Sequence, residues 1–176
     1  MLLRFFSAVL AASVSTTAVA GCPSSFDPWA IPSEWGKKVG TLYQTMPEGI
    51  FEASNTSLLG ERVSYVILEG GNKWSVFYRI ADYRVSSPSP LPPSLKNTFL
   101  RSYPKAVCSG KRELCRYDHE GARDGGLMGA VLLGEYPRNL NYEGPATNLI
   151  AGESIDQKSM PLFVVCRYYS QELEDE

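Results

Sequence analysis

The chain has 176 residues, with 17 basic side chains, 19 acidic side chains and a single histidine, a length that suits one globular domain. The formal net charge of −2 argues against a protein that grips nucleic acid through bulk charge, because such proteins carry a basic stripe. We therefore expect no DNA partner. With one histidine, His119, any chemistry that needs an imidazole proton donor has a single candidate side chain.

The first twenty residues are typical of a secretory signal peptide. Arg4 precedes an apolar run over residues 5–14, and residues 18–20 form the small-residue ending Ala-Val-Ala. The run is too short to cross a bilayer, and no later segment approaches roughly 20 apolar residues, so no transmembrane segment is expected. Losing Arg4 with the leader leaves 16 basic and 19 acidic residues, a net charge of −3. The sequence predicts a secreted monomer with one domain over residues 21–176.

Residues 19–22 also resemble the lipobox of bacterial lipoproteins. In that motif the cysteine, here Cys22, becomes the lipidated first residue of the mature chain. Lipidation would leave three thiols, an odd number that cannot close completely into disulfides. Simple secretion is therefore preferred, and a bacterial lipoprotein or inhibitor-type binding protein stays an alternative.

Four cysteines in a secreted chain indicate two disulfides, for which three connectivities are possible. We expect Cys108 to pair with Cys115 across a short loop, and Cys22 to pair with Cys166 as a clasp between the two ends of the fold. In the chain-entropy model the short loop contributes roughly 2–3 kcal/mol and the long one about 5 kcal/mol. No Cys-x-x-Cys or histidine spacing indicates a metal site, so neither a metal nor another cofactor is expected.

An N-terminal helix is predicted over residues 33–44, with Ser33 as its N-cap and an apolar stripe at near-helical spacing. The stripe consists of Trp35, Val39, Leu42 and Tyr43. Such a stripe is typical of a helix that lies on a sheet. The sequon that begins at Asn55 is a candidate glycosylation site.

A β-hairpin is predicted next, with strands over 62–68 and 73–85 and a glycine-rich turn between them. Residues 86–94 contain four prolines and four serines and should form an exposed connection. This connection divides an N-terminal region, 21–94, from a C-terminal region, 95–176. A short helix over 95–101 could follow it.

Apolar strands are predicted over 127–133, 148–151 and 162–169, separated by turn-like segments. Helices early in the chain and antiparallel strands late in it favour an α+β fold. In this fold the inner face of the sheet would pack on the N-terminal helix.

Short motifs between residue 103 and about residue 169 are Tyr103-Pro104, Glu120-Gly121, Glu135-Tyr136-Pro137, Tyr142-Glu143-Gly144-Pro145-Ala146 and a late apolar strand that bears a cysteine. With these motifs the chain resembles the fungal guanyl-specific ribonucleases and their bacterial relatives. The resemblance implies a small secreted domain in which one helix packs on a curved antiparallel sheet.

The resemblance assigns the catalytic base to Glu135, which would accept the proton of the RNA 2′-hydroxyl. Lys105 stands where the family has a histidine, and it holds a positive charge without readily exchanging protons near neutral pH. Arg167 stands roughly where the family has its acid histidine, and a guanidinium stays protonated. The family's catalytic arginine is replaced by Asn148-Leu149. Glu135 would therefore be a vestigial base, because the catalytic groups that act with it in the family are missing.

His119 could replace the missing acid if residues 117–121 folded over the site, although in the family this region helps to hold guanine. Acid catalysis alone contributes roughly 10²–10⁴-fold, so its loss makes efficient turnover unexpected. The chain is also similar to the ribonuclease-like effectors of plant-pathogenic fungi, which lack the catalytic histidines. Its N-terminal region is longer than theirs, and their Tyr-x-Cys triplet is absent.

The expected function is therefore that of a secreted, non-catalytic ribonuclease-like effector that binds a host RNA or a host protein. An active guanyl-preferring endoribonuclease stays the alternative enzyme hypothesis, with Glu135 as base, His119 as acid and either Arg167 or Lys105 as electrostatic support. Exposed aromatic rings could stack on bases while nearby cations meet phosphates. The candidate binding residues are Lys105, Tyr117, Glu120, Tyr136, Tyr142 and Arg167.

Overall fold

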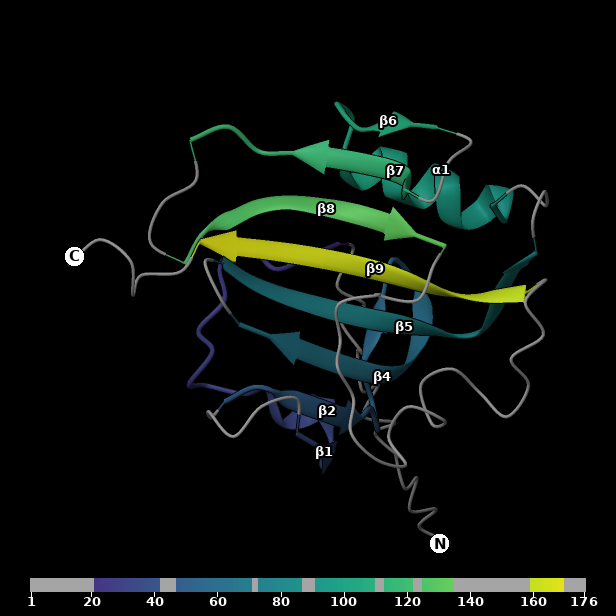
Figure 1. Cartoon of the computed structure of the whole chain (residues 1–176). Coiled ribbons are helices and arrows are strands. Elements are labelled where there is room, and N and C mark those ends of the chain that lie inside the picture. Colours follow the sequence, from purple (N-terminus) through teal and green to yellow (C-terminus); the bar gives the residue numbers. More distant parts are fainter. Residues whose placement is uncertain are drawn as a thin grey trace, which may run out of the picture.

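The structure is a computed structural model that describes residues 21–41, 47–70, 73–86, 91–109, 113–121, 125–134 and 159–169. Over these residues the chain forms one large antiparallel sheet and one α-helix (Figure 1). The elements are η1 (Ser33–Trp35), β1 (Lys37–Gly40), β2 (Gly49–Glu52), β3 (Ser57–Leu58), β4 (Glu61–Glu69), β5 (Lys73–Ser86), α1 (Pro93–Ser102), β6 (Val107–Cys108), β7 (Glu113–Asp118), β8 (Leu127–Leu133) and β9 (Ser159–Tyr169).

The last strand of the chain lies in the middle of the sheet. The strand order is β1-β2-β4-β5-β9-β8-β7-β6, with the two-residue β3 paired to β4 off this path. β9 pairs with β5 on one side and with β8 on the other, and Figure 1 shows it running across the centre. The strands before and after residue 94 therefore belong to one sheet.

The predicted N-terminal helix is wrong, and with it the expected fold of an N-terminal helix packed on a curved sheet. Residues 33–35 form a single 3-10 turn, and β1 follows it and pairs with β2. Gly36, between them, has a φ of 76° and lies so close to the Glu52 carbonyl oxygen that a side chain would not fit. Strand pairing thus prevails over the helical spacing. Residues 42–44 lie outside the described part of the chain.

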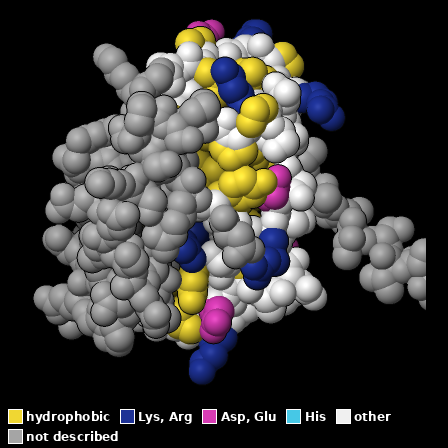
Figure 2. Space-filling model, turned by 90° about the vertical axis from the view of Figure 1, so that its right-hand side faces the viewer, with side chains coloured by type: hydrophobic (Ala, Val, Ile, Leu, Met, Phe, Trp, Pro, Cys, Tyr) yellow, Lys and Arg dark blue, Asp and Glu magenta, His cyan; other side chains and the backbone are white. Residues whose placement is uncertain are grey.

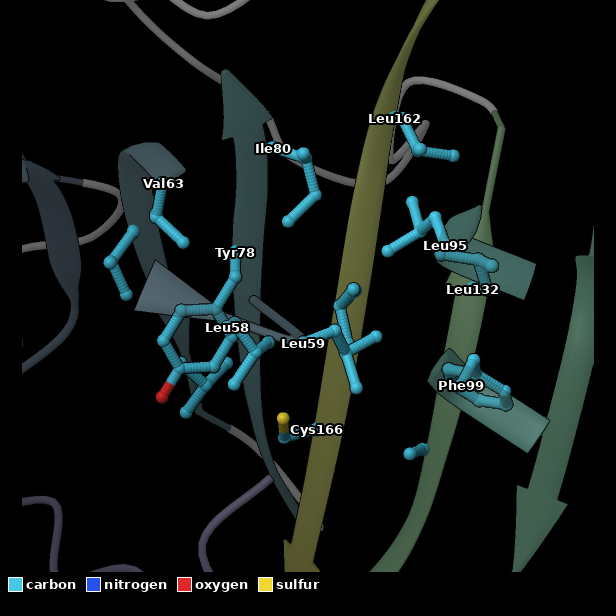
Figure 3. Packing of buried hydrophobic residues seen from close by; sticks show 14 of the residues in the cluster. Leu58, Leu59, Val63, Tyr78, Ile80, Leu95, Phe99, Leu132, Leu162 and Cys166 are labelled. Carbon is cyan, nitrogen blue, oxygen red and sulfur yellow. The ribbon is translucent and has the colours of Figure 1, made fainter. Parts of the chain in front are cut away.

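The single α-helix of the described residues comes after the fifth strand instead. α1 confirms the short helix that the sequence predicts over 95–101, and it begins at Pro93, where a missing N–H costs nothing. Leu95 and Phe99, four residues apart, are buried against the sheet. Figure 3 shows both side chains beside Leu132 of β8. The helix therefore covers one face of the sheet near β8.

Alternation along β9 separates two cores, one on each face. Leu162, Val164, Cys166 and Tyr168 belong to the larger cluster, which also contains the buried residues of α1. The residues between them point to the opposite face. There a row of directly paired side chains crosses five strands: Ile50, Ile67, Phe77, Val165 and Val131. All five are buried. Because β9 is therefore covered on both faces, its sequence is a nearly continuous apolar run.

The strand predictions agree with the structure where it describes them. The predicted strand over 127–133 coincides with β8, and those over 62–68, 73–85 and 162–169 lie within β4, β5 and β9. Residues 148–151 lie outside the described ranges. Among the residues described, the structure contains no helix with the length and hydrophobicity of a bilayer crossing.

Both predicted disulfides are confirmed. Cys22 pairs with Cys166 with their Cα atoms 5.7 Å apart, and this bond joins residues 144 positions apart. It ties the N-terminal segment to the central strand. Cys108 pairs with Cys115, which lies directly opposite it across β6 and β7.

Candidate functional site

Three aromatic side chains lie next to one another at the β6–β7 end of the sheet: Tyr103 and Tyr117 are stacked, and the His119 ring is tilted against that of Tyr117. We call these three residues the tyrosine stack. The rings of Tyr103 and Tyr117 are 4.9 Å apart and nearly parallel. The Tyr117 hydroxyl lies 2.9 Å from Nδ1 of His119, within hydrogen-bond distance. Tyr103 is buried, whereas His119 is exposed, so the stack runs from the core to the surface.

The end of α1 fixes the inner member of the stack. The backbone N–H of Tyr103 donates to the carbonyl oxygen of Phe99 at 2.8 Å, and the two rings lie 4.8 Å apart. The Tyr103 hydroxyl accepts a hydrogen bond from the N–H of Cys22 at 2.6 Å. Burial raises the pKa of this hydroxyl, and the bond from Cys22 partly offsets the rise. Tyr103 therefore links the helix, the clasp and β7.

Two further predicted binding residues flank the tyrosine stack. Lys105 lies exposed in the turn between α1 and β6, two positions after Tyr103. Glu120 lies exposed in the turn after β7, next to His119. The structure thus places Lys105, Tyr117, His119 and Glu120 around one edge of the sheet.

Arg167, in contrast, lies on the other face of the sheet. It follows Cys166 and precedes Tyr168 on β9, and both neighbours are buried in the cluster that contains α1. Tyr117 packs against that same cluster. Because successive side chains of a strand point to opposite faces, Arg167 points away from Tyr117. The structure therefore does not bring Arg167 together with His119, which contacts Tyr117.

Arg167 has an acidic neighbour on its own face. Its partner in β8 is Gly129, and the partner of Gly129 in β7 is Asp118. Gly129 has no side chain, so the charges of Arg167 and Asp118 interact across it. A hydrogen bond from Arg116 lowers the pKa of Asp118, and the positive charges of Arg116 and Arg167 lower it further. The Arg116 Nε atom lies 2.7 Å from an Asp118 carboxylate oxygen.

Several predicted site residues lie outside the described part of the chain. These are Glu135, Tyr136, Tyr142 and the Asn148-Leu149 pair. Asn55, the predicted glycosylation site, is described and lies exposed in the bend between β2 and β3. The roles assigned to all of these residues stay predictions.

Sequence reasoning missed a pair of carboxylates at the β4–β5 turn. Glu48 is only 8% exposed, and its Oε1 atom accepts the N–H of Gly70 at 2.7 Å. Among the described residues its other oxygen, Oε2, is buried without a hydrogen-bond partner. Burial raises the pKa of Glu69, and the charge of Glu48 raises it further. The turn-like composition of residues 69–72 draws attention to Glu69, but no sequence pattern indicates that Glu48 is buried beside it.

An exposed tryptophan on a fixed turn was missed as well. Trp29 is 65% exposed, and its backbone N–H donates to the Asp27 side chain at 2.9 Å. Before this turn, the Phe26 ring lies 5.7 Å from that of Trp35 and 5.3 Å from that of Tyr168. The turn therefore projects Trp29 from an anchored segment. The signal available in the sequence is the cluster of prolines and aromatic residues after Cys22.

The charges on one side of the molecule are dispersed. Figure 2 shows hydrophobic side chains at the surface, with basic side chains at separate places and acidic ones among them. A protein that grips phosphates non-specifically presents a continuous basic stripe instead. The face in Figure 2 has no such stripe among its described residues.

Comparison with known proteins identified no relative of the chain. No protein-family model matches the chain, and no curated protein or solved structure matches it significantly. The resemblance to ribonucleases therefore depends on the short motifs alone, and the function has to be argued from the geometry of the site.

Proposed function

We propose that this protein is a secreted, non-catalytic effector that binds a host protein. The observation that carries the non-catalytic part of the proposal is the placement of His119 and Arg167 on opposite faces of the sheet. The motifs that resemble ribonuclease-like effectors support the effector role, and the two disulfides are typical of proteins from oxidising compartments.

The separation of His119 and Arg167 argues against RNA cleavage. Cleavage through the 2′-hydroxyl needs a base, an acid and a positive charge at the same phosphate. His119, the only imidazole of the chain, lies beside Tyr117 on the α1 side. Arg167 lies beside Asp118 on the other side. Arg167 is therefore not placed to hold a phosphate that His119 would protonate. The exposed Lys105 is left as the cation on the side of His119, and its ammonium group lacks the paired donors with which a guanidinium binds phosphate.

The charge distribution favours a protein over an RNA as the partner. The mature chain carries a net charge of −3, and the acidic Asp118 accompanies both Arg116 and Arg167. Binding of RNA draws its affinity from phosphate contacts, which acidic neighbours weaken. Trp29, on its anchored turn, is instead the kind of side chain that dominates protein–protein contacts.

The clasp disulfide also supports secretion over lipidation. The sulfur of Cys22 is bonded to the sulfur of Cys166. A lipid thioether needs that same sulfur, so the bond leaves no place for the lipid. Simple secretion is therefore the form of the proposal that we carry forward.

The proposal is tested first for catalysis. The mature protein should leave guanine-containing single-stranded RNA intact, or cleave it no faster than a His119→Ala variant does. Guanine-directed cleavage that leaves a 2′,3′-cyclic phosphate and disappears in His119→Ala and in Glu135→Gln would overturn the proposal. A Lys96→Ala variant on the exposed side of α1 serves as the control for handling and folding.

The nature of the partner is tested by two binding measurements. RNA affinity, measured by fluorescence anisotropy, should be weaker than micromolar at physiological salt. Affinity purification from host tissue should give one dominant protein, whose affinity for the purified mature chain is then measured directly. Micromolar RNA binding that falls steeply with salt would instead favour the RNA-binding form of the effector.

A further inference from the structure

Two carboxylates lie opposite each other where β2 begins and β4 ends; we call Glu48 and Glu69 the acidic pair. Gly49 of β2 pairs with Leu68 of β4, so the next residues outward, Glu48 and Glu69, continue the same register. Side chains at directly opposite positions have their Cβ atoms about 4.5–5.5 Å apart, and two like charges there are destabilising. A positive charge between the two carboxylates would therefore stabilise this end of the sheet.

No positive side chain of the described residues neutralises the acidic pair. Neither carboxylate forms an ion pair with any residue that the structure describes. The ammonium group of Lys38, on the neighbouring strand β1, lies over the ring of Phe51, which belongs to the cluster on the α1 face. Ile50, two residues after Glu48, belongs to the cluster on the other face. The acidic pair therefore faces away from Lys38.

The buried member of the acidic pair keeps one oxygen without a partner. Glu48 is 8% exposed, and its Oε1 atom accepts the N–H of Gly70. A Cβ atom at residue 70 would lie 2.5 Å from this Oε1 atom and 2.8 Å from a ring carbon of Trp74, so only glycine fits. The Oε2 atom is buried and has no hydrogen-bond partner in the described part of the chain. A buried anionic oxygen without a partner is costly, so it marks a place for a cation or a proton.

A third oxygen atom lies beside the acidic pair. Ser75 of β5 is directly opposite Glu69 and is only 8% exposed. Its hydroxyl group forms no hydrogen bond with another described residue. Arg167 of β9 follows on the far side of Ser75, and its charge acts on Asp118, further along the sheet. The strands β2, β4 and β5, which lie side by side in Figure 1, thus present two carboxylates and a hydroxyl group on one face.

We propose that Glu48, Glu69 and Ser75 bind a calcium ion between β2, β4 and β5. Carboxylate and hydroxyl oxygens suit a hard cation, and Ca²⁺ tolerates irregular sets of about six to eight oxygen ligands, which water can complete. Mg²⁺ demands a nearly ideal octahedron instead. Calcium sites of extracellular modules have dissociation constants of about 0.1–1 mM, and we expect a value in this range.

The calcium site is independent of the tyrosine stack and of the effector role. The sequence indicates no metal because it has no cysteine or histidine spacing of a metal site. A carboxylate site needs no such spacing. Glu48 and Glu69 are brought together only by the pairing of β2 with β4.

The first test is terbium luminescence of the full mature chain after treatment with a chelator. Tb³⁺ resembles Ca²⁺ in size and in its preference for oxygen ligands, and it emits when a nearby tryptophan absorbs light. Trp74 can serve as that tryptophan, because its ring lies beside Gly70. We expect a saturable signal that Ca²⁺ displaces. Glu48→Gln and Glu69→Gln should each weaken calcium binding about tenfold or more, because the site depends on ligand charge.

The second test is thermal unfolding with and without calcium. In the presence of a chelator, Glu69→Gln should melt above the wild type, because it removes a like charge from the acidic pair. When calcium exceeds its dissociation constant about tenfold, the wild type should gain about 3–6 °C. Glu48→Gln and Glu69→Gln should gain little. Glu52→Gln, which removes an exposed carboxylate from the same strand β2, should respond to calcium as the wild type does.

Two results would overturn the proposal. If calcium up to about 10 mM changes neither the terbium signal nor the melting temperature, the acidic pair is held by a proton and not by a metal ion. If Glu52→Gln weakens binding as much as Glu48→Gln does, the ion is bound by surface charge in general. Neither measurement uses RNA or a host protein, so a failure here is distinct from a failure of the proposed function.

Discussion

The centre and the edge of the sheet differ in what holds them and in what they offer. At the centre, β9 is paired on both sides, and its residues from Pro161 to Cys166 are buried. At the edge, β6 has two residues, and Val107 is 73% exposed. The tyrosine stack lies near this edge. Stability is therefore concentrated at the centre, whereas the exposed candidate residues at the edge, Lys105, His119 and Glu120, can change with little effect on folding.

The largest effects that test this comparison are expected from removing each of the two disulfides. Replacing both Cys22 and Cys166 by alanine should lower the free energy of unfolding by about 5 kcal/mol, because the bond closes a long loop in the unfolded chain. The matched variant, with Cys108 and Cys115 replaced, should lose roughly 2–3 kcal/mol. Urea unfolding measures both values. Equal losses would contradict a difference in constraint between centre and edge.

The α1 face of the central core gives the next largest effect. Phe99→Ala should cost about 3–5 kcal/mol, because the ring is fully buried between α1 and the sheet. Lys96→Ala, on the exposed side of the same helix, should stay within about 0.5 kcal/mol of the wild type. Thermal unfolding followed by circular dichroism compares them. Similar losses in the two variants would mean that α1 is not packed as described.

Glu69 at the β4–β5 turn and Asp118 at the end of β7 should respond to pH with opposite signs. The pKa of Glu69 is raised by burial and by Glu48, so ionising it opposes folding and stability falls as pH rises above its unfolded value. Glu69→Gln should therefore raise the melting temperature at pH 7. The pKa of Asp118 is lowered, so Asp118→Asn should reduce stability at pH 7. Melting curves between pH 4 and pH 8 check both, and a change of the same sign in both variants would refute the assignment.

The smallest effect is expected at the exposed end of the tyrosine stack. Tyr117→Phe removes the hydroxyl that lies 2.9 Å from His119 and keeps the ring that stacks on Tyr103. Its cost should not exceed about 1 kcal/mol, because the lost hydrogen bond is exposed to water. Tyr117→Ala, which also removes the stacked ring, should cost more. If the two variants are equally stable, the stacking does not support the edge.

Much of the sheet could be predicted because strand composition and cysteine number are local signals. The apolar stretches of β8 and β9 and the hairpin of β4 and β5 were recognised this way, as was the pairing of Cys22 with Cys166. The N-terminal helix could not be excluded by such signals. Trp35 and Val39 have near-helical spacing, yet Gly36 and the pairing of β1 with β2 impose an extended chain.

The candidate site was harder to predict because its contacts join distant parts of the chain. No local signal brings Tyr103, at the end of α1, onto Tyr117 of β7. The position of Arg167 could have been inferred, since a buried disulfide at Cys166 leaves the next residue of the strand on the other face. Glu48 escaped notice because its burial depends on the β4–β5 turn.

The central claim is that Arg167 is not placed to hold a phosphate that His119 would protonate. The most direct test is an NMR titration of the mature protein with guanosine 3′-monophosphate, following the side-chain signals of both residues. The account predicts that they will not shift together with a common binding curve. Saturable shifts of both signals with one dissociation constant, lost in His119→Ala, would contradict it.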